Sequence, residues 1–126
     1  MRLLLDTVTL LFAIEASHRI SPKAKSALAN QSNIREISVV SLAEIALKNA
    51  IGKLALSKNE LVEAMNELQV RILPCTANHA LQLFNLPLHH RDPFDRQIIA
   101  QALAENIPVV TCDEQFCLYE QLNVIW

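Results

Sequence analysis

The sequence predicts an α/β fold, a sandwich of helices around a mostly parallel sheet. Short apolar runs alternate along the chain with longer segments whose apolar residues recur at helical spacing, as in strand–helix–strand units. One glycine and five prolines interrupt 126 residues, which is too few for the frequent tight turns of an all-β architecture. The length suits one compact domain, and residues 1–126 are expected to form it.

The N-terminal third is expected to contain two strands and two helices. Residues 2–5 are a short apolar run typical of a buried strand, and residues 7–16 carry apolar side chains at helical spacing. Ser21-Pro22 is an N-cap followed by proline at the first helical position, so a helix should begin there and end near residue 30. Residues 36–40 are rich in β-branched side chains, which favour a strand.

Two capping boxes predict two helices in the middle of the chain. Ser41 and Glu44 have the S-x-x-E spacing, and their helix should stop at Gly52, which is well placed for a left-handed C-terminal cap. The same spacing at Ser57 and Glu60 opens an amphipathic helix.

The C-terminal half continues the alternation of strands and helices. The expected elements are a strand at 70–73, a helix at 76–84, a loop at 87–91, a helix from Asp92-Pro93 to about residue 106, a strand at 107–111 and a last short strand at 124–126.

The composition argues against several classes of protein. No apolar run approaches the roughly 18 residues of a membrane span, and the apolar N-terminus is too short for a signal peptide, so a cytoplasmic protein is expected. Cys75, Cys112 and Cys117 are an odd number without Cys-x-x-Cys spacing, which predicts buried free thiols. The net charge of −2 gives no overall electrostatic signal for nucleic acid.

Acidic residues follow the predicted strands or lie in the helices that come next. They are Asp6 after residues 2–5, Glu44 one helical turn after 36–40, Asp95 in the helix that begins at Asp92-Pro93, and Asp113 after 107–111. Ligands of open parallel sheets bind beyond the carboxyl ends of the strands, so these carboxylates should lie together. Their mutual repulsion in a cleft favours a divalent cation between them. Oxygen ligands favour Mg²⁺ or Mn²⁺ over zinc, and such an ion can present a water for attack on a phosphodiester.

Each acid also has a purely structural interpretation. Asp6 and Asp113 could end a strand or occupy a turn, and Glu44 suits its capping box. Asp92 is better explained as a helix N-cap than as a ligand, and Asp95 as a first-turn acid favoured by the helix dipole. The evidence for a metal site is therefore the expected proximity of four acids, and no single acid is sufficient evidence.

Four blocks of sequence resemble the motifs of PIN domains, in the family's order and spanning residues 3–116. The blocks are LLLDT at 3–7, SVVSLAEIA at 38–46 followed by Lys48 and GKL at 52–54, HRDPFDR at 90–96 continuing through IIAQA at 98–102, and VTCDEQF at 110–116. The second block resembles VapC-type toxins of bacterial VapBC toxin–antitoxin pairs, and the third is the most specific.

The resemblance implies a PIN-like three-layer α/β/α sandwich and a ribonuclease that uses Mg²⁺ or Mn²⁺, forms a homodimer and is silenced by a cognate antitoxin. It implies catalytic and metal-binding roles for Asp6, Glu44, Asp95 and Asp113, with Asp92 and Thr111 as supporting residues. The chain departs from the family at Val8, Phe12 and Ala43, where close relatives have His, Trp and often an aromatic residue. These positions bear on substrate or antitoxin contact more than on metal binding.

Basic residues beside the acidic blocks are candidates for binding RNA phosphates. Beside the third block they are Arg91, Arg96, His89 and His90, and after Glu44 they are Lys48 and Lys53. A solvated loop and solubilising surface lysines explain them as well. When the four acids and Asp92 are set aside, eight acids remain against eleven Lys and Arg, so the rest of the surface is mildly basic.

Two other functions remain open on the sequence alone. One is a PIN nuclease of RNA processing that has no antitoxin, and the other is a non-catalytic interaction module with a PIN-like fold. The four acids argue against the module, since a binding surface gains nothing from a cluster of mutually repelling carboxylates. A small upstream reading frame with a DNA-binding N-terminal half would indicate the toxin.

Overall fold

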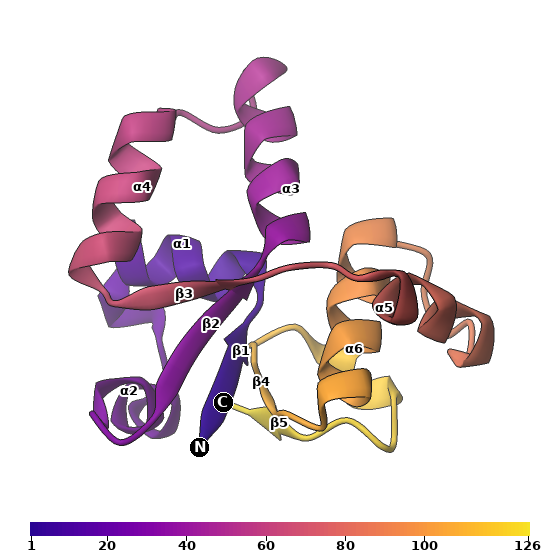
Figure 1. Cartoon of the computed structure of the whole chain (residues 1–126). Coiled ribbons are helices and arrows are strands. Elements are labelled where there is room, and N and C mark those ends of the chain that lie inside the picture. The colour runs from indigo at the N-terminus through magenta and orange to yellow at the C-terminus, as the bar shows by residue number, and fades with distance from the viewer.

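Five parallel strands form the centre of the protein, here described for residues 1–126 from a computed structural model (Figure 1). The strands are β1 (Arg2–Leu5), β2 (Ile34–Ser38), β3 (Val70–Leu73), β4 (Val109–Val110) and β5 (Val124–Ile125), in the order β3-β2-β1-β4-β5. Leu5 of β1 is in register with Ile37 of β2 and with Val110 of β4. The carboxyl ends of these three strands therefore meet at one edge of the sheet.

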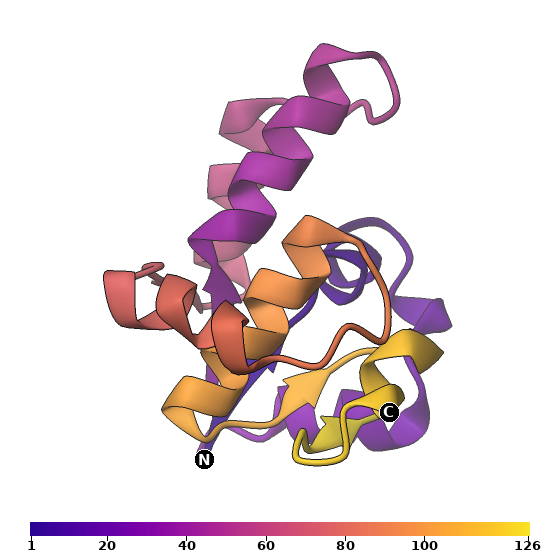
Figure 2. The same ribbon diagram turned by 90° about the vertical axis from the view of Figure 1, so that its right-hand side faces the viewer.

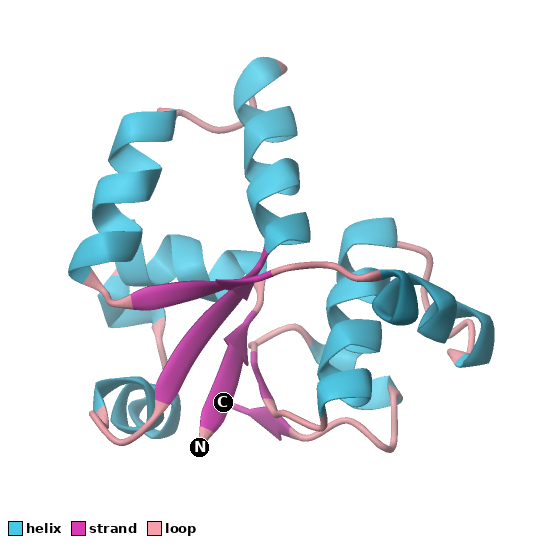
Figure 3. Ribbon diagram, in the orientation of Figure 1, coloured by secondary structure: helices cyan, strands magenta, loops and turns pink.

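Helices cover both faces of this sheet, which confirms the predicted three-layer sandwich (Figure 3). The helices are α1 (Thr7–Glu15), α2 (Pro22–Ala29), α3 (Val39–Ala50), α4 (Lys58–Glu67), α5 (Ala77–Leu81) and α6 (Pro93–Glu105), with 3₁₀ turns at Ser17–Arg19, Gln82–Asn85 and Glu114–Leu118. Successive side chains of a strand point to opposite faces. Leu4 accordingly packs in one core cluster with Ile99 of α6, whereas Leu5 packs in another with Leu10 of α1.

Helices α3 and α4 extend together beyond the body of the sandwich (Figure 2). Gly52 ends α3 as predicted, because it adopts φ 76° and its N–H donates to the carbonyl of Asn49. The next N–H, that of Lys53, donates to the carbonyl of Lys48, which completes a Schellman cap. None of the helices has the length and apolar character needed to cross a membrane.

The start of α3 differs from the prediction in a way that matters for the site. The second strand ends at Ser38 rather than at residue 40, and Ser38 is the N-cap, accepting the N–H of Val40 at 3.0 Å. The predicted capping box at Ser41 is therefore wrong. Ser41 lies inside the helix, where its hydroxyl accepts a hydrogen bond from Thr7 at 2.9 Å. Glu44 is thus free of the capping role that competed with a functional one.

The other predicted elements are confirmed with shifts at their ends. Ser21, Ser57 and Asp92 cap their helices, and the segment at 76–84 forms α5 followed by a 3₁₀ turn. The strand predicted at 107–111 is reduced to Val109–Val110.

The cysteines are free, as expected, but they are not buried. Cys112 and Cys117 are exposed and Cys75 is partly exposed, so the prediction of buried thiols was wrong. Two of the three follow β4, where the chain returns to the surface.

Candidate metal centre

Asp6 lies where β1 meets α1, and only 3% of it is exposed. It caps α1, with Oδ1 accepting the N–H of Thr9 at 2.8 Å, and its Oδ2 accepts the hydroxyl of Thr111 at 2.6 Å. Burial raises the pKa of Asp6, and the hydrogen bonds from Thr111 and Thr9 oppose this rise. Both the capping and the functional interpretations of Asp6 are therefore compatible with its position.

Thr111 and Asp113 come from the neighbouring strand end, just after β4. Thr111 is buried, and its Oγ1 accepts the backbone N–H of Asp113 at 3.0 Å while donating to Asp6. Asp113 is half-buried and caps the following 3₁₀ turn by accepting the N–H of Gln115 at 2.9 Å. One hydroxyl thus connects the two acids that end adjacent strands.

Glu44 projects from the second turn of α3 and is 6% exposed. Its Oε2 lies 2.9 Å from Nζ of Lys48, one turn further along the helix. Its Oε1 is buried and has no hydrogen-bond partner. A buried acceptor without a hydrogen-bond donor is unfavourable. This oxygen is therefore suited to bind a group that the protein itself does not supply, such as a cation.

Asp95 lies in the first turn of α6, and its pKa is raised to about 7. Burial is the largest cause of this rise. The negative charges that add to it are, in order, those of Asp92, Asp113, Glu44 and Asp6. The charges of four other acids therefore act on one carboxyl group, so each of them lies within electrostatic reach of Asp95.

Asp92 is the exposed N-cap of α6, accepting the N–H groups of Phe94 and Asp95 at 2.9 Å each. Its negative charge acts on Asp95, but one of its oxygens is occupied by capping. This position suits the supporting role predicted for it.

Three of the candidate phosphate-binding residues lie in different environments. Arg91 is exposed at the loop before α6, and Lys48 pairs with Glu44 beside the acids. Arg96 is partly buried, and it donates to the carbonyl of Pro87 at 2.8 Å and to the hydroxyl of Tyr119 at 3.2 Å. Arg96 thus holds the 86–90 loop, and any contact with a phosphate would compete with these bonds.

His90, expected beside the site as a possible phosphate ligand, instead contacts Asp95 and Tyr119, and Tyr119 had not been expected near the site. Nε2 of His90 lies 3.5 Å from Oδ2 of Asp95, and its Nδ1 lies 2.8 Å from the hydroxyl of Tyr119. His90 stands in the third acidic block, but Tyr119 is 29 residues away and has no signal of its own. A surface cavity of about 550 Å³ is lined in part by Tyr119 and His89, and none of the four acids lines it.

The donor set of the four acids fits a hard divalent cation. It is made of carboxylate oxygens alone, which favour Mg²⁺ or Mn²⁺. Glu44 offers an unpartnered oxygen, and each oxygen of Asp6 accepts one hydrogen bond and keeps a lone pair. As the side chains stand, no group of three His, Cys, Asp or Glu converges closely enough to coordinate one ion. Binding therefore requires these side chains to rotate toward a common point.

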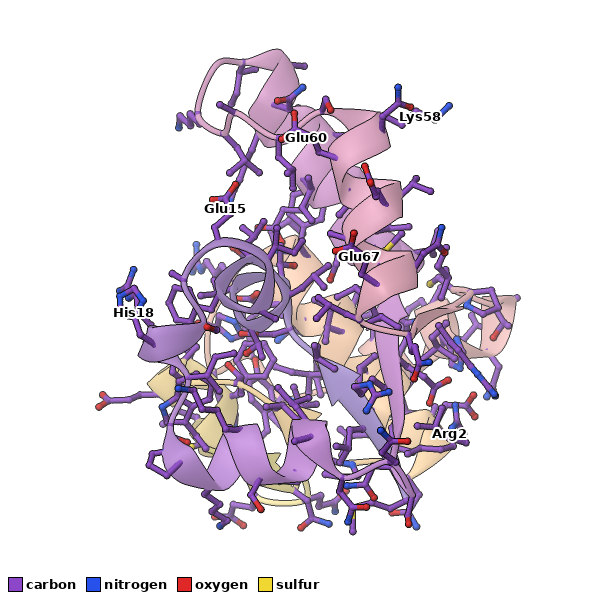
Figure 4. The ribbon with its side chains drawn as sticks, turned by 90° about the vertical axis from the view of Figure 1, so that its left-hand side faces the viewer. Arg2, Glu15, His18, Lys58, Glu60 and Glu67 are labelled. Carbon is purple, nitrogen blue, oxygen red and sulfur yellow. The ribbon has the colours of Figure 1, made fainter.

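The ionic contacts at the other end of the strands are separate from this centre. Arg2, at the start of β1, forms a bidentate pair with Glu36 at 2.7 and 3.0 Å. Figure 4 shows Arg2 far from Lys58 and Glu60, which mark the projecting end of α4. This pair serves the fold and takes no part in the cluster of four acids.

A family model described as the PIN domain matches residues 3–122. The chain therefore belongs to the PIN-domain family, whose members are nucleases. No match was found among the curated proteins.

Solved structures with this fold include complexes of toxin–antitoxin systems. The chain is similar to VapBC2 from Rickettsia felis bound to a promoter DNA fragment, with 20% identity, a TM-score of 0.73 and coverage of 98% of this chain and 97% of that one. It is also similar to DNA-bound VapBC from Salmonella typhimurium, with 18% identity, a TM-score of 0.71 and coverage of 98% and 96%. VapBC-5 from Mycobacterium tuberculosis gives 19% identity, a TM-score of 0.61 and the same coverage.

Proposed function

We propose that this protein is a metal-dependent ribonuclease of the VapC type, a cytoplasmic toxin that hydrolyses RNA phosphodiester bonds. The observation that carries the proposal is the gathering of Asp6, Glu44, Asp95 and Asp113 from four elements, with Asp95 under the charge of all the others. Like charges at one place destabilise a fold unless a cation joins them, so the cluster is better explained by function than by stability. The VapBC complexes with this fold support the choice of toxin.

The four acids would hold Mg²⁺ or Mn²⁺, with Asp92 adding charge and Thr111 fixing the position of Asp6. When bound there, the cation supplies an attacking water and neutralises the negative charge that develops on the phosphate. The protein's own contribution is to hold the four carboxyl groups near one another. Because the pKa of Asp95 is raised to about 7 without metal, a bound cation would also favour its deprotonated form.

The basic residues around the acids provide the contacts for an RNA backbone. Lys48 orients Glu44 and leaves 43% of its side chain exposed, so its ammonium can contact a phosphate as well. Arg91 is exposed beside the first turn of α6. Arg96 contributes through the 86–90 loop that it holds, which leads directly into Arg91.

A protein partner is proposed because one face of α3 carries exposed apolar side chains. They are Val39, Ala43, Leu47 and Ile51, spaced four residues apart, and Leu47 and Ile51 are at least half exposed. Contiguous exposed apolar surface marks interaction sites. We propose that a second copy of the chain covers this face in a homodimer and that a cognate antitoxin binds near the acids.

The direct test is cleavage by the purified chain. RNA and single-stranded DNA of the same sequence are incubated with Mg²⁺, with Mn²⁺ and with EDTA, and the products are separated on denaturing gels. RNA cleavage with either metal and none with EDTA supports the proposal. Cleavage that persists in EDTA would contradict the metal mechanism, and cleavage of DNA alone would contradict the substrate.

Two other functions are separated from this one by simple observations. A non-catalytic module predicts no cleavage of either substrate and no metal-dependent change in stability. An RNA-processing nuclease predicts cleavage but no growth arrest and no antitoxin reading frame beside the gene.

A further inference from the structure

Two buried side-chain polar atoms in the protein have no hydrogen-bond partner, and both are at the proposed metal centre. They are Oε1 of Glu44 and Nε2 of His90. The proposed role of Glu44 as a metal ligand explains its Oε1. The second is a ring nitrogen of a residue that the proposed chemistry does not use, on a side chain only 11% exposed. Unsatisfied buried groups call for an explanation, because native proteins contain few of them.

Nε2 of His90 lies 3.5 Å from Oδ2 of Asp95. The distance is slightly longer than a good N–H···O bond, and a movement of about half an ångström would make one. Asp95 must rotate in any case when the four acids converge on an ion, since they do not converge as they stand.

The partners of His90 determine which of its two nitrogens carries the proton. A guanidinium can only donate hydrogen bonds, so the hydroxyl oxygen of Tyr119 accepts from Nη1 of Arg96 at 3.2 Å. The hydroxyl hydrogen is then directed to Nδ1 of His90, 2.8 Å away. With Nδ1 as the acceptor, the neutral ring carries its proton on Nε2, on the side of Asp95. With the proton on Nδ1 instead, the lone pair of Nε2 would face the negatively charged carboxylate of Asp95, which is repulsive.

We propose that His90 is a positioning residue of the metal centre, which donates its Nε2–H to Oδ2 of Asp95 and so fixes the rotation of that carboxylate toward the ion. Arg96 and Tyr119 hold His90 in the donating tautomer. The inference rests on the proposed function, because it assigns Asp95 as a ligand. Hydrogen bonds to metal ligands commonly set ligand orientation, and their removal weakens metal binding or activity by roughly 10- to 100-fold.

The contacts of Arg96 with the 86–90 loop also hold Tyr119 and His90 in place. Arg96 also donates to the carbonyls of Pro87 and His90, at 2.8 and 3.5 Å, so the residue that fixes Tyr119 also fixes the backbone that carries the imidazole. The Tyr119 ring packs edge-on against both His89 and His90, with centroids 4.8 and 5.6 Å apart. His89 shares this packing but is exposed and has no polar contact with Asp95, which makes it the matched control.

The first experiment determines the tautomer in the metal-free protein. Nitrogen-15 NMR of the imidazoles is recorded at mildly alkaline pH, and His90 is assigned by comparison with a His90→Gln sample. A proton on Nε2 is expected, and its signal should change in Tyr119→Phe. A proton on Nδ1 alone, or the averaged mixture of a free imidazole, would overturn the proposal whether or not the protein cleaves RNA.

The second experiment measures Mn²⁺ binding by calorimetry and the Mn²⁺ dependence of RNA cleavage. His90→Leu, which lacks a donor, should weaken Mn²⁺ binding roughly 10- to 100-fold and raise the Mn²⁺ needed for half-maximal cleavage by a similar factor. His90→Gln, whose amide can donate to Asp95, should restore most of the affinity. His89→Leu should leave it unchanged.

The outcomes separate this inference from the proposed function. Equal Mn²⁺ affinity in wild type and His90→Leu, with only the melting temperature lowered, would show a merely structural histidine and overturn the inference alone. Absence of Mn²⁺ binding by the wild type would overturn the metal centre, and with it the role of His90.

Discussion

Thr111 donates a hydrogen bond of 2.6 Å from Oγ1 to Oδ2 of Asp6, across 105 residues of sequence. Oγ1 of Thr111 also accepts the backbone N–H of Asp113, so one side chain hydrogen-bonds to both of the acids that follow β1 and β4. The bond also counteracts the effect of burial on the pKa of Asp6, as do the hydrogen bonds from Thr9.

Thr111→Val should lower both stability and activity. The substitution keeps the shape of the side chain but leaves a buried carboxylate oxygen without its donor, which costs roughly 1–3 kcal/mol of the free energy of unfolding. RNA cleavage should fall roughly 10- to 100-fold because Asp6 loses its orientation. Thr111→Ser, which retains the hydroxyl, is the control. Urea unfolding and cleavage rates that match wild type in Thr111→Val would contradict the role of this bond.

The stability of the metal-free protein should fall as pH rises from about 4 to about 7. The pKa of Asp95 is raised from its ordinary value of 3.8 to about 7 in the folded protein, so the folded state holds this proton more tightly than the unfolded state does. Its contribution is present at low pH and is lost as pH rises through the folded value. One pKa unit corresponds to about 1.4 kcal/mol. Asp6 adds a trend of the same sign, because its pKa is also raised.

Unfolding by urea in EDTA across this pH range measures the trend. The dependence should be weaker in Asp95→Asn, with the remainder due to Asp6. If wild type and Asp95→Asn lost stability equally over this range, the raised pKa of Asp95 would be wrong.

Expression of the chain without an antitoxin should arrest bacterial growth. Asp6→Ala should relieve the arrest, because it removes a proposed ligand. Asp6 also caps α1, so protein abundance must be measured alongside growth. Asp6→Asn keeps a capping oxygen and is the second variant. Arrest by both variants at wild-type abundance would remove Asp6 from the mechanism.

The chain should sediment as a dimer at micromolar concentration. Leu47→Glu places a charge at the middle of the apolar face of α3 and should shift the protein toward the monomer. Val62→Glu makes the same change at an exposed position of α4 and is the control. A wild-type protein that is a monomer throughout would argue against the homodimer, and a Leu47→Glu dimer would place the interface elsewhere.

The sequence was sufficient to predict the position of the acids because strand ends are local features. A short apolar run followed by an acid, as at residues 2–6, indicates both the strand and the edge at which the acid lies. The caps at Ser21, Gly52 and Asp92 were predictable for the same reason, since each depends on residues within one helical turn.

Features that depend on distant segments were not predictable. Ser41 has a capping-box spacing with Glu44, yet Ser38 caps the helix because β2 ends earlier and Ser41 instead meets Thr7 of α1. The contact of His90 with Asp95 is local, but its direction is set by Tyr119, which only the folded chain brings near. Nothing in the sequence spacing of these residues indicates that arrangement.

Comparison of wild type with Asp95→Asn tests the proposed metal centre most directly. The substitution removes one negative charge from the cluster while keeping a polar first-turn side chain, so stability in EDTA should be unchanged or higher. RNA cleavage should fall steeply, and stabilisation by Mn²⁺ in thermal melts should shrink, because binding to the folded state stabilises it according to ligand affinity. Asp92→Asn, at the exposed cap, should have much smaller effects on both. Unchanged cleavage and Mn²⁺ response in Asp95→Asn, with a lower melting temperature in EDTA, would show that Asp95 serves only the helix dipole and would contradict the metal centre.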